Sequence, residues 1–167
     1  MSEETLASVW ETEGMSKDDI KDAVEGNLAP KGKWLGQLAP VNFETDAQVV
    51  VSEKGEHPLE GKRVVRCHAV LQTDVGEKHI FFDAFPATVK ATSKKGGTYI
   101  RQESLHAAYL YQGTELIGHP FEEVLEAAAN AMLVYDIGIK KEREDPETGD
   151  IYRAENTLRG IRPFKEA

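Results

Sequence analysis

The sequence predicts a mainly β domain of the α+β class, with its helices confined to one insertion and to the N-terminal region. Three strand-like runs, at 47–51, 62–72 and 79–85, precede a helical segment, and a strand–turn–strand pattern follows it. The run at 62–72 places apolar residues at alternate positions, which is typical of a strand with one buried face. Pro86 ends the third run, because proline has no N–H to donate within a sheet.

The helical insertion and the pattern after it complete the predicted fold. Residues 104–111 are helix-like, and Pro120 suits the first turn of a second helix at 120–131. A strand at 133–143, a turn at DPETGD and a returning strand at 151–161 form a closing hairpin. Three strands, a helical insertion and a closing hairpin are the element order of the five-stranded OB barrel, which binds oligonucleotides and oligosaccharides. We therefore expect an OB-fold-like barrel with the helices between its third and fourth strands.

Two regions differ sharply in composition. Residues 1–26 form an acidic N-terminal leader that we expect to be mobile or to form a short helix, and residues 27–167 form a single OB-fold-like nucleic-acid-binding domain. Ser16 is a suitable N-cap for such a helix. Leu6, Val9 and Trp10 have helical spacing and are expected to dock onto the domain or onto a partner. The basic, glycine-containing segment 87–100 reads as a mobile loop available for function.

Length and composition indicate a soluble protein. The 167 residues suit one domain, with 40% hydrophobic and 29% charged residues and no apolar run that would span a bilayer. The acidic N-terminus lacks the features of a signal peptide. The single cysteine, Cys67, excludes an internal disulfide and fits a reducing compartment. We expect a cytoplasmic location without membrane association.

The formal charge of −9 is unevenly distributed. The leader holds eight acidic residues against two lysines, so the rest of the chain has 21 acidic and 18 basic residues. A nearly neutral domain can present a basic face to phosphates, which respond to the local potential. The acidity is equally compatible with a role in solubility alone.

Catalytic motifs are not evident. No phosphate-cradling or dinucleotide-binding glycine pattern occurs, and the five histidines lie about ten or more residues apart without metal-ligand spacing. Cys67 falls on the apolar side of its strand and reads as a small buried hydrophobe. We therefore expect no enzyme, no cofactor and no metal. A nuclease using Asp83 with Glu103 or Glu115 is a third alternative, with nothing in the spacing that demands it.

Residues suited to a single nucleic-acid strand accompany the predicted strands and loops. Such a site needs cations along the phosphate track and aromatic faces for stacking bases. In the third strand either Phe81 and Phe85 or Ile80 and Phe82 fill the interior, and Trp34 is either a barrel plug or a stacking platform. The candidate nucleic-acid-binding residues are Trp34, Arg66, His68, Phe81, Phe85, Lys94, Lys95, Tyr99, Arg101, Tyr152, Arg153 and Arg159.

Several segments resemble one family. The entry PKGKWLG (30–36), the segment LEGKRVV (59–65), the aromatic third strand and the close ENTLRGIRPF (155–164) are similar to the small phage-encoded single-stranded-DNA-binding proteins of replication and recombination modules. The resemblance implies an OB-fold, sequence-independent binding of single-stranded DNA, and a place in the cytoplasm of a bacterial host. Many single-strand binders end in an acidic tail, whereas this chain carries its acidity at the N-terminus. We expect this acidic leader either to recruit replication or recombination proteins or to compete with DNA.

Other interpretations remain open at this stage. The same composition suits a phage structural or assembly protein, or an adaptor with a β-barrel core. The preference between DNA and RNA depends on contacts to the 2′-hydroxyl that no sequence pattern reveals. An exposed strand edge of an open barrel would also allow a homodimer.

Overall fold

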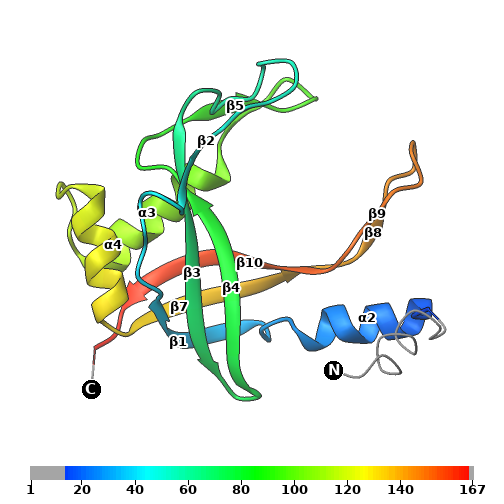
Figure 1. Cartoon of the computed structure of the whole chain (residues 1–167), viewed down its shortest axis with the longest axis horizontal. Coiled ribbons are helices and arrows are strands. Elements are labelled where there is room, and N and C mark those ends of the chain that lie inside the picture. Colours follow the sequence, from blue (N-terminus) through cyan, green and yellow to red (C-terminus); the bar gives the residue numbers. More distant parts are fainter. Residues whose placement is uncertain (1–13, 166–167) are drawn as a thin grey trace, which may run out of the picture.

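The computed structural model describes residues 14–165 and contains three helices and ten strands within them. The elements before the helical insertion are α2 (Lys17–Gly26), β1 (Gly32–Leu38), β2 (Ala47–Val49), β3 (Arg63–Thr73), β4 (Gly76–Ala84), β5 (Lys90–Thr92) and β6 (Thr98–Ile100). They are followed by α3 (Gln102–Thr114), α4 (Phe121–Asn130), β7 (Leu133–Lys140), β8 (Arg143–Glu144), β9 (Ile151–Tyr152) and β10 (Glu155–Pro163). The α+β class is confirmed (Figure 1).

The helix α2 forms where its capping residue predicts. Ser16 Oγ accepts a hydrogen bond from the N–H of Asp19 at 3.1 Å, and the Asp19 carboxylate accepts one from the N–H of Ser16 at the same distance. None of the ten residues of α2 is buried. Lys78 Nζ donates to the carbonyl oxygen of Gly26 at 2.8 Å, which fixes the end of the helix to β4. The expected docking of Leu6, Val9 and Trp10 lies outside the described residues.

A six-stranded antiparallel sheet is organised around β3. On one side β3 pairs with β4, and on the other its two halves pair with β2 and β1. β1 also pairs with β7, and β7 pairs with β10. The β3–β4 hairpin runs in continuous register from Val65 opposite Ala84 to Thr73 opposite Gly76. Both strands and the tight turn expected between them are therefore present, within three residues of the predicted bounds.

The hydrophobic core lies between one face of this sheet and the two helices of the insertion. Figure 1 shows α3 and α4 together at one side of the sheet. The largest fully buried side chains come from β1, β3, α3, α4, β7 and β10, with Leu59 from the loop before β3: Tyr135, Leu38, Leu59, Leu71, Leu110, Leu125, Ile137, Ile161 and Val124. Burying each such side chain contributes about 1.5–3 kcal/mol. The core thus fixes which face of each strand remains outside.

The sheet stays open along one seam. Within residues 14–165 no backbone pairing joins β4 to β10, the two strands that would have to meet to close a barrel. Helix α3 packs against both strands at this place. Gly113 allows the close approach, because a Cβ there would overlap Ile161 Cγ2 of β10. A helix therefore bridges the seam that backbone hydrogen bonds leave open.

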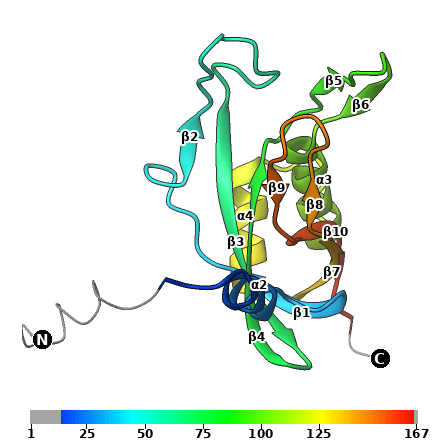
Figure 2. The ribbon, with the colours of Figure 1, turned by 90° about the vertical axis from the view of Figure 1, so that its right-hand side faces the viewer.

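Two hairpins extend from the body and differ from the predicted elements. The segment predicted as a mobile loop forms the β5–β6 hairpin, and its turn is closed by Ser93 N–H to the Gly97 carbonyl at 2.7 Å, with Gly96 at φ +86°. The returning strand predicted at 151–161 is divided into β9 and β10, so that β8 and β9 form a second hairpin. Strands of two or three residues are too short for periodicity to reveal. Figures 1 and 2 show both hairpins extending beyond the sheet.

None of the helices in the described part of the chain combines the length and the apolar composition required to cross a bilayer.

A substitution at Gly113 tests the packing of α3 on β10. Alanine normally stabilises a helix interior by about 1 kcal/mol relative to glycine. We expect Gly113→Ala to destabilise the protein by about 1–3 kcal/mol instead, because the added methyl meets Ile161. Urea unfolding measures the difference, and Gln112→Ala, at an exposed position of the same helix, is the control. A stabilised Gly113→Ala variant would contradict this packing.

Candidate nucleic-acid interface

The outward side chains of β3 and β4 form one surface because of the two-residue period of a strand. Cys67 and Phe82 point inward and are buried, so their neighbours point outward. Arg66 lies opposite Asp83, and His68 lies opposite Phe81. We call the surface of Arg66, His68, His79, Phe81 and Asp83 the outer β3–β4 face. The question left open by the sequence is thus resolved: Ile80 and Phe82 fill the interior, and Phe81 is outside.

Three rings are stacked on the outer β3–β4 face. The His68 ring lies 4.4 Å from the Phe81 ring, with 15° between their planes, and 4.9 Å from the His79 ring, with 29° between them. His68 Nε2 and His79 Nδ1 are 2.6 Å apart. Phe81 is 56% exposed. A phenylalanine that is this exposed on its strand presents apolar ring surface to solvent. A planar ligand can stack on such a surface and remove it from water.

A cation lies beside this stack. The Arg66 guanidinium is 5.5 Å from the centre of the Phe81 ring, and its Nη1 is 3.2 Å from the Asp83 carboxylate. Both side chains of this ion pair are about half exposed. Exposed pairs of this kind contribute little to stability, so a phosphate can compete for Arg66 at small cost. The face therefore combines a stacking surface with a cation that is available to an anion.

The two hairpins add further candidate residues. Lys94, Lys95 and Tyr99 belong to the β5–β6 hairpin, and Tyr152 and Arg153 lie on or beside β9. Both tyrosines are almost half exposed. The guanidinium of Arg143 covers the Tyr152 ring at 5.0 Å, and Arg153 is paired with Glu142 at 2.6 Å.

A charge on the β5–β6 hairpin affects a carboxyl group on the β8–β9 hairpin. The pKa of Asp145, in the β8–β9 turn, is held below its ordinary value mainly by the backbone N–H of Glu147, with a contribution from the charge of Lys94 on the other hairpin. Figure 2 shows both hairpins on the same side of β3 and β4. Lys94 of the β5–β6 hairpin thus lies near enough to the β8–β9 turn to act on Asp145.

A cleft of about 300 Å³ opens at the edge of the outer β3–β4 face, between β4, α3 and β10. We call it the seam cleft. Three of its lining residues lie at the bases of the two hairpins: Gln102 follows β6, Lys140 ends β7 and Glu155 begins β10. The other polar lining residues are Arg66, Asp83, Glu103, His106, Tyr109, Asn156 and Thr157.

On the other side of Phe81 a second hollow is bounded by the end of α2. Its lining includes His79, Phe81, Val24 and Leu28, and it shares Glu155 and Asn156 with the seam cleft. Asn156 fixes the segment between α2 and β1. Its side-chain amide forms two hydrogen bonds with the backbone of Ala29, at 2.9 and 2.8 Å. Phe81 thus lines both hollows.

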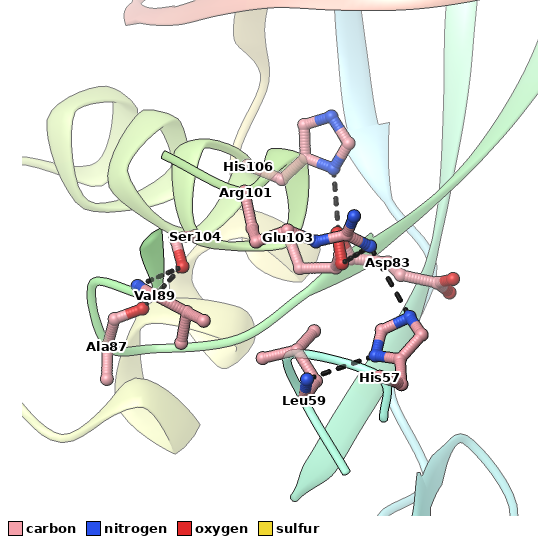
Figure 3. A network of polar contacts seen from close by, with 9 residues as sticks. All are labelled: His57, Leu59, Asp83, Ala87, Val89, Arg101, Glu103, Ser104 and His106. Atoms are coloured by element: carbon pink, nitrogen blue, oxygen red, sulfur yellow. Dashed lines mark hydrogen bonds and ion pairs between the residues drawn. The ribbon is translucent and has the colours of Figure 1, made fainter. Parts of the chain in front are cut away.

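Arg101, predicted to contact phosphate, is held in a structural network instead (Figure 3). Its Nη2 donates to the Glu103 carboxylate at 2.9 Å and approaches His57 Nε2 at 3.5 Å. His57 in turn accepts a hydrogen bond from the N–H of Leu59 at 3.0 Å. The network joins the loop before β3 to the start of α3. Sequence reasoning could not find it, because His57 is 44 residues away from Arg101.

Three further predicted residues lie apart from the outer β3–β4 face. Trp34 packs against the core, and its indole N–H donates to the Pro30 carbonyl at 2.7 Å, so it acts as a plug. Phe85 follows the end of β4 and is half-buried. Arg159 is exposed on β10 beside a bulge, with its stem close to Gly138.

Residues that the sequence analysis did not select also border the interface. His79 shares the stack, and His106, Tyr109 and Gln102 line the seam cleft. Alternation along the third strand already placed His79 on the same side as Phe81, which was the available signal. The cleft residues gave none, because they lie on α3 and the rest of the cleft comes from four other elements that meet α3 only in the folded chain.

Cys67 is not set up as a nucleophile. Burial, followed by the charges of Asp83 and Asp46, raises the pKa of Cys67 to about 12, so the thiol stays protonated at neutral pH. Among residues 14–165 no group of three or more His, Cys, Asp or Glu side chains is placed to hold a metal ion.

No protein-family model, curated protein or solved structure matches this chain. Function is therefore inferred from the geometry of the site itself.

Two histidines make stability depend on pH. Burial lowers the pKa of His68, with a further contribution from His79, and burial lowers the pKa of His106 despite its bond to the Asp83 carbonyl. Unfolded histidine has a pKa of about 6.5, so the unfolded chain binds these protons more readily. Stability is then complete above about pH 6.5 and is lost as the pH falls below that value.

We expect thermal unfolding to occur at a lower temperature at pH 5.5 than at pH 7.5. His106→Asn, which retains a donor near the position of Nδ1, should reduce this difference by removing one titrating group. Differential scanning fluorimetry at both pH values provides the measurement. An equal pH dependence in the variant and the parent would show that His106 does not carry the effect.

Proposed function

We propose that this protein is a non-catalytic module that binds single-stranded nucleic acid on the outer β3–β4 face. The observation that carries the proposal is the exposed stack of Phe81 and His68 with Arg66 beside it. Stacking on an aromatic side chain contributes about 1–3 kcal/mol per base and tolerates any sequence. Bases in a duplex are already stacked on one another, so the face favours a single strand.

The strand order supports an OB-fold-like arrangement as part of this proposal. In an OB barrel the second and third strands carry the ligand, together with the loop between the first two strands and the loop between the last two. Here β3 and β4 are the corresponding strands if β1 and β2 together form the first one, and the β8–β9 hairpin is the last loop. The outer β3–β4 face thus lies where such a barrel binds oligonucleotides, although the seam is bridged by α3.

The cations of the β5–β6 hairpin support a track for phosphates, whereas residues 140–155 around the β8–β9 hairpin hold four basic and six acidic side chains. Lys94 and Lys95 lie on the β5–β6 hairpin, Arg153 lies beside β9, and Arg66 lies on the face itself. The acidic leader makes a second contribution to the proposal, since the end of α2 borders the hollow beside Phe81. Repulsion from α2 would shift binding toward the β5–β6 hairpin, and its exposed acidic residues would recruit basic replication or recombination partners. We include in the proposal the role that the family resemblance implies, which is binding of single-stranded DNA in phage replication or recombination.

Binding to a labelled oligo-dT of about 30 nucleotides, followed by fluorescence anisotropy, tests this function. We expect binding to the single strand and much weaker binding to the matching duplex. The affinity should fall steeply between about 50 and 200 mM salt, because phosphate contacts release counterions.

The controls decide between this function and its alternatives. A variant of the β5–β6 hairpin, Lys94→Ala with Lys95→Ala, should have a smaller salt slope, whereas Lys54→Ala, at an exposed position of the loop before β3, should not. Absence of binding at low salt would refute the proposed function, and a large assembly that forms without nucleic acid would favour a structural role instead.

A further inference from the structure

The seam cleft has features that stacking on Phe81 does not use. It is walled by polar side chains from five elements, and its volume of about 300 Å³ lies at the lower end of the range for small-molecule sites. A space of this size suits one base or one nucleoside and not a large cofactor. Phe81 stands at its rim, so a strand stacked on that ring passes the opening.

One wall offers a hydrogen-bond acceptor of defined type. His106 Nδ1 lies 2.7 Å from the Asp83 carbonyl oxygen, which can only accept, so Nδ1 carries the proton. In the neutral ring Nε2 is then an acceptor, and Figure 3 shows it pointing away from Asp83. The lowered pKa of His106 keeps the ring neutral at pH 7. No described residue donates a hydrogen bond to Nε2.

The β7–β10 side of the cleft offers a second acceptor and a cation. The carboxylate of Glu155 belongs to the first residue of β10, and Lys140 lies directly opposite it in the β7–β10 register. Both acceptors line the same space and would accept from a ligand that donates. The exocyclic amino groups of cytosine, adenine and guanine do so with two N–H each, whereas thymine offers one N–H, at N3. Lys140 can meet the phosphate of the same nucleotide.

From this arrangement we infer that the seam cleft receives one unstacked base of the bound strand and prefers a base with an exocyclic amino group. The inference rests on the proposed single-strand binding and adds a base preference to it. Enzymes and RNA-binding proteins read extruded bases in the same way, through hydrogen bonds to the Watson–Crick edge and stacking on a neighbouring ring. The rest of the strand remains bound without regard to sequence.

A competition experiment with two oligonucleotides tests the inference. One is an oligo-dT of about 12 residues and the other is the same oligomer with a single central dC. Because binding elsewhere tolerates any base, the protein can slide until the cytosine meets the cleft. One additional hydrogen bond to a charged or neutral acceptor should make the dC oligomer bind about threefold to tenfold more tightly.

Matched variants locate the preference. Gln102→Trp, at an exposed cleft residue, should block the cleft and equalise the two affinities, whereas Gln112→Trp on the exposed side of the same helix should not. Glu155→Ala should reduce the preference, and Glu144→Ala, with the same change of charge outside the cleft, should leave it intact.

The outcomes separate the inference from the function on which it depends. Tight binding of both oligomers with equal affinity overturns the base pocket and leaves single-strand binding standing. If Gln102→Trp still binds the dC oligomer more tightly than oligo-dT, the base is recognised outside the seam cleft, and this also overturns the inference. If neither oligomer binds at low salt, the proposed function fails and the pocket fails with it.

Discussion

The register of the β3–β4 hairpin is the constraint on which the rest of the molecule depends. Nine consecutive residue pairs, from Val65 opposite Ala84 to Thr73 opposite Gly76, determine which side chains are buried and which form the outer β3–β4 face. A slip of one residue would expose Phe82 and bury Phe81. The same slip in β3 would place His68 and Arg66 in the core, where unpaired polar groups are costly. Core packing and the candidate site are therefore determined together.

The unpaired seam between β4 and β10 affects both the stability of the sheet and the shape of the candidate site. Since backbone pairing does not join β4 to β10 within the described residues, these strands are held by α3, which approaches β10 closely at Gly113 and Ile161. A helix leaves side-chain-lined space where a paired strand would leave none. The same feature that weakens closure of the sheet thus produces the seam cleft, next to the exposed ring of Phe81.

The sequence predicted the strands with clear alternation and the helices with clear caps. The alternation at 62–72 placed Arg66 and His68 outside, and Ser16 marked the start of α2, as observed. It could not decide between Phe81 and Phe82, because HIFFDAF carries apolar residues on both sides and only pairing with β3 distinguishes them. The hairpin at 90–100 was missed because its strands have three residues each. The network of Arg101 was not predicted because its partner His57 is close only in the folded chain.

The most direct test of this account is the affinity of Phe81→Ala for oligo-dT, compared with Phe164→Ala. Both remove a phenylalanine that is roughly half exposed, at 56% and 44%, and only Phe81 belongs to the stack with His68 and Arg66. Loss of one stacked base corresponds to about 1–3 kcal/mol, or roughly fivefold to 150-fold in affinity. We expect a loss of this size for Phe81→Ala and almost none for Phe164→Ala. Equal affinities for the two variants would contradict the assignment of the outer β3–β4 face as the binding surface.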